Sequence, residues 1–183
     1  CWLITMTKIL TIPESVSINF EKYAIFLKGN STQLVMEIPE GLSISGGNNK
    51  VSVSIIQEID KPVSKYLRGL LGTFSSNLKN NMKGIHTGFN KQLNLVGVGY
   101  RAEKTKEGIS LKIGYSNPIA IKEEHGVSFE VTKANVIQIN GNSLQHVTQK
   151  AANIRKLRRP EPYKGKGILF KKERILRKEG KKV

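Results

Sequence analysis

The stretch that organises this chain is AANIRKLRRPEPYKGKGI, residues 151–168. Its first part continues an apolar helical stripe, and three arginines recur at i, i+3 and i+4 on another face: Arg155, Arg158 and Arg159. Two prolines, at positions 160 and 162, then stop the helix and restrict the backbone beyond it. Alternating lysines and glycines follow. Such a segment is suited to contact with a polyanion.

Upstream of this stretch, the second half of the chain predicts an antiparallel meander that leads into the helix. Apolar residues alternate in short runs that are separated by turn formers, which is the pattern of strands. Ser143 is a plausible cap for the helix, and its core-facing stripe is Leu144, Val147, Ala151 and Ile154. The predicted strands carry Leu93, Leu95, Val98, Tyr100, Ile109, Leu111, Ile113, Ile119, Ile121, Val127, Phe129, Val131, Val136, Ile137 and Ile139.

The first half follows the same plan. Short alternating runs between Ile12 and Ile59 predict strands, and the SGGNNK segment predicts a hairpin turn. Asp60 can cap a helix whose first turn contains Pro62. The stripe of that helix is Val63, Leu67, Leu70, Leu71, Phe74 and Leu78, and its end is expected to fray through Asn80, Asn81 and Gly84.

Two segments resemble each other across the halves. PEGLSI at residues 39–44 and EEHGVSF at 123–129 place Gly41 and Gly126 at equivalent points, an offset of 85 positions. We therefore predict an internal duplication. The fold class is α+β, with two tandem similar domains that each pack a small antiparallel sheet with one helix. The predicted boundaries are 1–86, 87–160 and, for a basic C-terminal extension, 161–183.

The charge distribution narrows the kinds of binding partner that fit this chain. The chain has a net charge of +16, and residues 150–183 contain 14 Lys/Arg against 3 Glu. Phosphates spaced along a nucleic acid reward such clustering through counterion release. A solvated tail and an anionic membrane surface are the alternatives. No stretch approaches the roughly 20 apolar residues that span a bilayer, and the opening CWLITM is too short for a signal peptide.

The residues that catalysis or cofactor binding would need are missing. The single cysteine, Cys1, excludes an internal disulfide, and the three histidines lack metal-ligand spacing. GVGYRA at 97–102 fits GxGxxA, but a strand pattern instead of a helix follows it. Asp60 is the only aspartate, and the KGKG segment lacks the Walker spacing. We expect no enzyme activity, no cofactor and no metal.

The segment after the helix fits contact with phosphates. Gly165 and Gly167 let the main chain approach phosphates that Lys164 and Lys166 neutralise. Tyr163 can stack on a base or ribose, or pack back on the domain. The cationic track continues through Lys171, Lys172, Arg174, Arg177, Lys178, Lys181 and Lys182.

Several of these motifs resemble the large-subunit ribosomal protein L6 family. RRPEPYKGKGI at 158–168 looks like the signature of that family, and KQLNLVGVGYRA at 91–102 is a second close match. GYSNPI at 114–119, AANIR at 151–155 and RKEGKK at 177–182 occur in the family's order and spacing. The resemblance covers nearly the whole chain.

The resemblance implies two tandem α+β domains and an architectural role in the large ribosomal subunit. Its C-terminal domain and basic tail would bind large-subunit rRNA near the sarcin/ricin loop, beside neighbouring ribosomal proteins and the site that translation factors visit. No membrane or DNA partner is implied. A non-ribosomal protein-interaction module with a basic tail is the alternative. The implied rRNA-binding residues are Arg155, Lys156, Arg158, Arg159, Tyr163, Lys164, Gly165, Lys166, Gly167, Lys171, Lys172, Arg174, Arg177, Lys178, Lys181, Lys182 and, in the first helix, Arg68.

Three departures from the family pattern suggest fewer RNA contacts. Leu169 stands where a basic residue is usual, and Ser75 and Ser76 replace a further arginine of the first helix. CWLITMTK occupies the place of a basic N-terminal leader. With the many Ile, Lys and Asn residues, this erosion suits an organelle ribosome in the mitochondrial matrix; a plastid or the bacterial cytoplasm is the alternative.

Overall fold

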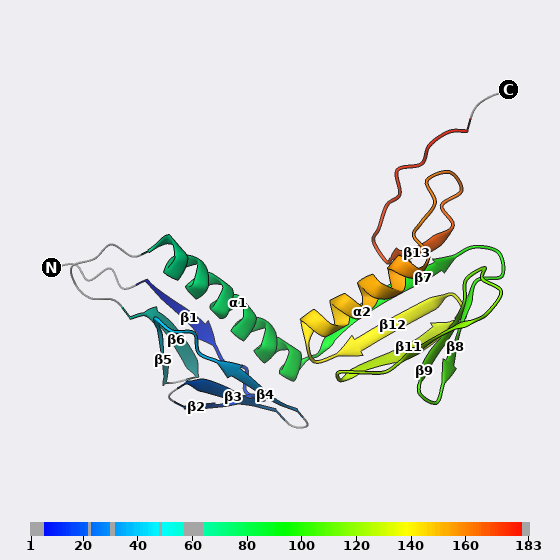
Figure 1. The fold of residues 1–183 in the computed structure, drawn as a ribbon. Coiled ribbons are helices and arrows are strands. Elements are labelled where there is room, and N and C mark those ends of the chain that lie inside the picture. Colours follow the sequence, from blue (N-terminus) through cyan, green and yellow to red (C-terminus); the bar gives the residue numbers. More distant parts are fainter. Residues whose placement is uncertain (1–5, 22, 30–31, 48, 57–63, 181–183) are drawn as a thin grey trace. The chain divides into compact units, whose positions relative to one another are not determined.

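The computed structural model describes residues 6–21, 23–29, 32–47, 49–56 and 64–180. The chain divides into two compact units, Cys1–Thr87 and Gly88–Val183, called here the first and the second unit (Figure 1). In the described residues, each unit contains antiparallel strands and one helix, so the α+β class is confirmed.

The described part of the first unit has six strands in two three-stranded antiparallel sheets, ordered β1-β6-β5 and β2-β3-β4. The sequence predicts a single sheet here. The strands are β1 (Thr7–Thr11), β2 (Ser17–Phe20), β3 (Ala24–Lys28), β4 (Gln33–Glu37), β5 (Leu42–Gly47) and β6 (Lys50–Ile55). Their buried residues, among them Ile25, Leu27, Val51 and Val53, form one core with the helix.

Helix α1 (Lys65–His86) covers this core with Leu71, Phe74, Leu78 and Met82. Its N-cap is Ser64, whose hydroxyl accepts from the Tyr66 amide at 3.3 Å. The predicted cap Asp60 and the residues Pro62 and Val63 lie outside the described residues.

The predicted fraying of α1 through Asn80, Asn81 and Gly84 is wrong, because the helix continues to His86. Met82 and Gly84 are buried near its end. Tertiary packing therefore outweighs the poor helix propensity of the asparagines and the glycine.

The second unit repeats the topology of the first. Its strands are β7 (Phe89–Val96), β8 (Arg101–Thr105), β9 (Gly108–Lys112), β10 (Ile119–Lys122), β11 (Val127–Lys133) and β12 (Val136–Gly141), followed by α2 (Leu144–Leu157). The sheets are β10-β9-β8 and β11-β12-β7-β13, in which β13 is Gly167–Phe170. Strands β7, β12 and β11 therefore correspond in order to β1, β6 and β5, and β8, β9 and β10 to β2, β3 and β4.

The segments that resemble each other across the halves each form a four-residue turn that places a glycine of positive φ before a strand, although the residue before that glycine has a positive φ only in the second unit, at His125. Gly41 and Gly126 have positive φ values of 90° and 69°, and each immediately precedes a strand. The Leu42 amide donates to Pro39 O at 3.3 Å, and the Val127 amide donates to Glu124 O at 3.1 Å. Glycine adopts a positive φ without the strain that a Cβ atom adds, so the matched glycines support the predicted duplication.

Strand β13 (Gly167–Phe170) is an addition that has no counterpart among the described strands of the first unit. It pairs antiparallel with β7, with Ile168 opposite Leu95 and Phe170 opposite Leu93. The predicted extension 161–183 is therefore partly integrated into the sheet of the second unit. Burial of Ile168 and Leu169 is the physical reason, since it adds apolar area to the core.

Residues 97–100 differ from the prediction, which places Val98 and Tyr100 in strands. Strand β7 ends at Val96, and a turn follows in which the Tyr100 amide faces Gly97 O at 3.4 Å. Gly99 has a φ of 76°, and Val98 is 91% exposed at the turn. Glycines at both sides of Val98 make this sharp turn possible.

Candidate nucleic-acid interface

Helix α2 is the base of the candidate interface because one of its faces is fixed in the core. Val147, Ala151 and Ile154 are buried, as the stripe predicts. The Ser143 hydroxyl accepts from the His146 amide at 3.5 Å, which identifies the predicted N-cap. Lys156 lies in the last turn, where a positive charge is favoured by the helix dipole.

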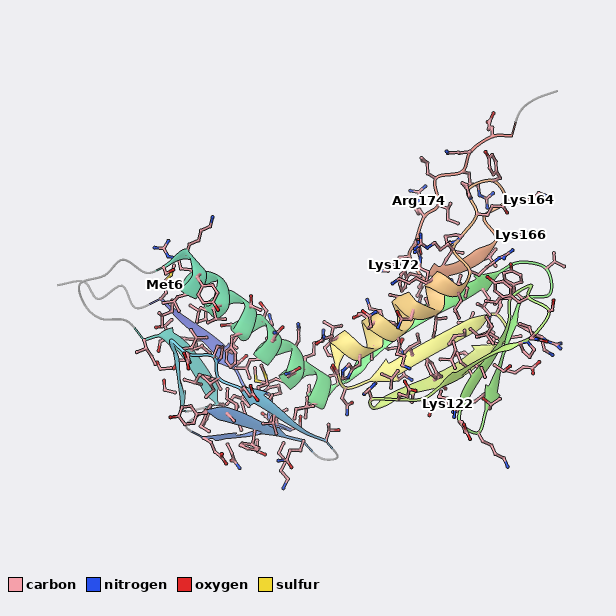
Figure 2. The ribbon with its side chains drawn as sticks, in the orientation of Figure 1. Met6, Lys122, Lys164, Lys166, Lys172 and Arg174 are labelled. Carbon is pink, nitrogen blue, oxygen red and sulfur yellow. The ribbon has the colours of Figure 1, made fainter. Side chains whose placement is uncertain are left out.

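Residues 158–167 form a loop that the backbone closes on itself. The Ile168 amide donates to Arg158 O at 2.9 Å at its base. The Glu161 amide donates to Lys166 O at 2.8 Å, and the Gly165 amide donates to Glu161 O at 3.0 Å. Lys164 and Lys166 are exposed on this loop, so their charges rest on a fixed support (Figure 2).

The two loop glycines have a structural role within the protein. A Cβ atom on Gly167 would lie 2.6 Å from the Cα atom of Pro160 and 2.8 Å from Arg159 O. Gly165 has a φ of 70°, and its Cβ atom would lie 3.4 Å from Nη2 of Arg177. Both glycines are buried. Loop closure therefore explains them, and a phosphate contact by their main chain stays a prediction.

The tail after β13 returns along the loop. The Lys171 amide donates to Gln92 O at 3.2 Å, and the Lys178 amide donates to Pro162 O at 3.0 Å. Figure 2 shows Lys172 and Arg174 on this tail. We call the ten exposed cations of the helix end, loop and tail the basic surface: Lys156, Arg158, Arg159, Lys164, Lys166, Lys171, Lys172, Arg174, Arg177 and Lys178.

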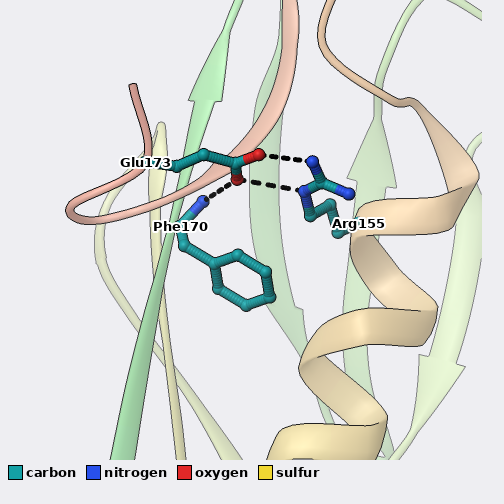
Figure 3. A network of polar contacts seen from close by, with 3 residues as sticks. All are labelled: Arg155, Phe170 and Glu173. Atoms are coloured by element: carbon teal, nitrogen blue, oxygen red, sulfur yellow. Dashed lines mark hydrogen bonds and ion pairs between the residues drawn. The ribbon is translucent and has the colours of Figure 1, made fainter. Parts of the chain in front are cut away.

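Arg155 differs from these cations because an acid inside the protein holds it (Figure 3). Its Nε lies 3.0 Å from Oε2 of Glu173, and its Nη2 contacts Oε1 of the same carboxylate. The Phe170 amide donates to Oε2 of Glu173 at 3.1 Å. This pair joins α2 to the start of the tail, so its first role is structural; the RNA contact expected of Arg155 stays a prediction.

Both members of this pair are shifted toward their charged forms. Hydrogen bonding to Arg155 lowers the pKa of Glu173, and the Phe170 amide lowers it further. Hydrogen bonding to Glu173 raises the pKa of Arg155. Desolvation opposes both shifts but is the smaller effect. The pair is therefore ionised at neutral pH.

The structure places the other predicted site residues as follows. Tyr163 is 54% exposed, which favours an outward-facing ring over one packed on the domain. Arg68 is exposed on α1 of the first unit and is not part of the basic surface. Leu169 is 8% exposed in β13, so the apolar residue at this departure from the family pattern is used in the core. Lys181 and Lys182 lie outside the described residues.

Two tyrosines near Arg158 are missed by the sequence reasoning. The Cζ atom of Arg158 lies 5.4 Å from the ring centroid of Tyr115, and the Tyr115 hydroxyl donates to Leu157 O at 2.8 Å. Tyr115 is in the GYSNPI motif and Tyr100 is in GVGYRA, both outside the cationic segment. No periodicity or charge pattern connects them with Arg158. Only their presence in motifs could have drawn attention to them.

Other kinds of site find little support in the described residues. His125 and His146, far apart in sequence, have ring centroids 5.3 Å apart. Within the part of the chain that the structure describes, no three His, Cys, Asp or Glu side chains group as metal ligands would. Neither described helix is long and apolar enough to cross a membrane.

Comparison with known proteins identifies the family. The sequence model of ribosomal protein L6 matches residues 12–88 and 96–171, one segment in each unit. A large ribosomal subunit protein uL6 from Leuconostoc mesenteroides subsp. mesenteroides is 40% identical over 174 residues, covering 95% of each chain.

Two further bacterial proteins, each named large ribosomal subunit protein uL6, agree with this match. The protein of Fusobacterium nucleatum subsp. nucleatum is 38% identical over 175 residues, 96% of each chain. That of Mycoplasmoides gallisepticum is 38% identical over 176 residues, 95% of this chain and 93% of its own. These bacterial relatives give no support to the expected mitochondrial compartment. Ribosomal proteins of this family are structural proteins and not enzymes. Because the family model matches a segment of both units, the chain belongs to the ribosomal protein L6 family.

Proposed function

We propose that this chain is a structural constituent of the large ribosomal subunit and binds large-subunit rRNA through the basic surface. The observation that carries the proposal is the exposure of ten cations around a loop and tail that the folded unit holds in place. The second unit contains 21 Lys/Arg against 8 Asp/Glu, and the first contains 9 against 6. The second unit is therefore the one suited to a polyanion.

The fixed backbone supports binding to a particular RNA shape. Hydrogen bonds at Ile168, Lys171 and Lys178 join the loop and tail to each other and to β7. Less conformational entropy is lost when RNA binds cations on a fixed backbone than when it binds them on a flexible tail. Phosphate positions on a folded RNA can then be matched by lysine and arginine positions.

The place of this contact within the subunit is the finer part of the proposal. By resemblance to its family, the second unit would bind near the sarcin/ricin loop, among neighbouring large-subunit proteins and beside the site that translation factors visit transiently. Because the relatives reported above are bacterial, a bacterial ribosome is proposed in place of the mitochondrial one that the composition suggests.

The test measures binding of the full chain to large-subunit rRNA at several salt concentrations. The test variant is R158A/R159A/K164A/K166A, and the control K104A/K106A/K122A/K133A removes four exposed cations elsewhere in the second unit. For the test variant we expect at least a tenfold loss of affinity. The slope of log K against log salt should fall by roughly 0.7–0.9 for each phosphate contact removed.

The control variant should bind within about twofold of the unchanged chain, because each exposed cation outside a contact adds little. Equal losses for both variants would mean that only net charge matters and would contradict the proposed interface. If the unchanged chain bound anionic vesicles and no rRNA, the alternative of a protein-interaction module with a basic tail would be favoured instead.

A further inference from the structure

The side chain of Arg158 rests on an aromatic ring and not on an acid. Its Cζ atom lies 5.4 Å from the Tyr115 ring centroid, within the range of a cation–π interaction. Among the described residues, no carboxylate lies within ion-pair distance of Arg158. Arg155, one turn earlier, is neutralised by Glu173. The two arginines therefore differ: the charge of Arg155 is balanced inside the protein, and that of Arg158 is not.

Tyr115 is itself fixed by the end of α2. Its hydroxyl donates to Leu157 O at 2.8 Å. This carbonyl belongs to the last turn of the helix, where carbonyl groups lack intrahelical partners. The hydrogen bond therefore ties the ring to the residue that immediately precedes Arg158. The ring is 49% exposed, so core packing does not account for its position.

Tyr100 stands beside this pair and is held by two glycine turns. A Cβ atom on Gly97 would lie 2.9 Å from the Tyr100 ring, and one on Gly114 would lie 3.3 Å from Cε1 and 3.5 Å from the hydroxyl. A larger residue at either turn would push the ring away. Interaction with the hydroxyl of Tyr115 first, and of Tyr100 second, raises the pKa of Arg158. The Arg158 guanidinium, at the end of α2, thus meets Tyr115 and Tyr100, which come from two other segments of the chain.

We propose that Tyr115 and Tyr100 are positioning residues that hold the Arg158 guanidinium so that its N–H edge can bind an RNA phosphate. The tyrosine hydroxyls interact with the Arg158 guanidinium without balancing its charge. A guanidinium has five N–H donors, so N–H groups remain on its edge that match two phosphate oxygens. An acid in the place of Tyr115 would occupy the same edge. This inference rests on the proposed function, because it deepens the role of one member of the basic surface.

The benefit of positioning is that Arg158 loses less freedom when RNA binds. Ordering one long side chain at an interface weakens binding by roughly two- to tenfold. Removal of the Tyr115 ring should therefore weaken rRNA binding by a factor in that range, although Tyr115 itself need not contact RNA.

The test is a double-mutant cycle between Tyr115 and Arg158, measured as affinity of the full chain for large-subunit rRNA. Tyr115→Leu removes the aromatic face, and Tyr115→Phe keeps the face while losing the hydroxyl. R158A weakens binding by some factor in each background. We expect this factor to be at least threefold smaller in the Y115L background than in the unchanged chain. In the Y115F background the effect of R158A should be closer to that in the unchanged chain. Thermal unfolding and circular dichroism identify variants that fold.

R159A is the matched control, since Arg159 is exposed beside Arg158 and has no aromatic partner among the described contacts. Its effect on affinity should be equal in the unchanged chain and in the Y115L background. A general loosening of the loop would change both arginines alike, and that outcome would overturn the proposal.

An undiminished effect of R158A in the Y115L background would also overturn the positioning role, while the proposed function stood. If Y115L fails to fold, Y115F carries the test. It keeps the ring and loses the bond to Leu157 O, so the proposal requires R158A to cost less affinity in Y115F than in the unchanged chain, while R159A costs the same in both. No effect of R158A, or of the quadruple variant described above, in the unchanged chain would mean that the proposed interface itself is wrong.

Discussion

The ion pair between Arg155 and Glu173 offers the sharpest test of how the tail is held. We consider the change of Glu173 to Gln, which removes the negative charge and keeps an oxygen able to accept from the Phe170 amide. Its partner change is Arg155→Met, which keeps an apolar stem near the Phe170 ring, whose centroid lies 5.8 Å from Cζ of Arg155. Together they form a cycle in which each single change leaves one charge without its partner.

The expected coupling follows from the geometry of the pair. The side chains are 30% and 22% exposed, so water screens them only in part. Hydrogen bonds to charged groups contribute about 1.5–3 kcal/mol, whereas fully exposed ion pairs contribute about 0.2–1 kcal/mol. A bidentate contact of intermediate exposure should lie between these ranges. We expect a coupling free energy of about 1–2 kcal/mol.

Amide hydrogen exchange near neutral pH is the suitable assay, because it reports local opening at individual amides. The informative amides are those of Phe170, Lys171 and Lys178, which bind Glu173, Gln92 and Pro162 respectively. Each single variant should exchange faster at Phe170 and Lys171 than the unchanged chain. The double variant should lose less protection than the sum of the two. Amides of β12, such as that of Ile139, are the internal control.

A coupling free energy below about 0.3 kcal/mol would refute this reasoning, since distant and independent sites already agree within that value. Faster exchange at β12 equal to that in the tail would also contradict it, because the change would then destabilise the whole unit and not the tail attachment.

The remaining predictions concern pH, loop closure and the core. The pKa of Glu173 is lowered, so the stabilisation by the Arg155–Glu173 pair should be complete above the ordinary carboxyl pKa of about 4.3 and lost as pH falls through the lower folded pKa. Amide hydrogen exchange of the tail, measured between pH 7 and pH 3, checks this. Gly167→Ala should lower the free energy of unfolding of the second unit, measured in urea, by at least about 2 kcal/mol, because its Cβ atom would lie 2.6 Å from Pro160 Cα. The control is Gly69→Ala, whose Cβ atom would have open space on α1 and which should raise the free energy of unfolding of the first unit by about 0.5–1 kcal/mol. Ile154→Ala should cost about 2–5 kcal/mol, since the side chain is 1% exposed, and an unchanged midpoint in urea denaturation would show that α2 does not cover the core as described.

Sequence patterns predict most of the second unit because its helix has a regular apolar stripe and its strands alternate. The stripe of Val147, Ala151 and Ile154 and the cap at Ser143 are confirmed. The duplication is visible in two short segments because glycine adopts the positive φ at Gly41 and Gly126 with the least strain. The family follows from motifs in residues 91–102 and 158–168, which need no structure to be recognised.

Elements whose stability depends on distant contacts are predicted less well. The end of α1 contains asparagines and a glycine that favour fraying, and burial of Met82 outweighs them. Strand β13 lies in a cationic stretch that predicts an extension, and its pairing with β7 depends on a partner about 75 residues earlier. Local propensity contains no information about such partners.

Sequence alone therefore determined the class of this protein: two repeated α+β units and a cationic segment suited to a polyanion. It also named the residues of that segment. Tertiary structure decided how they divide: Arg155 is neutralised by Glu173, Gly165 and Gly167 close the loop, and Arg158 rests on Tyr115. Composition and spacing fix which charges occur along a chain, but only three-dimensional contacts decide which charges are balanced inside the protein and which stay available to a partner.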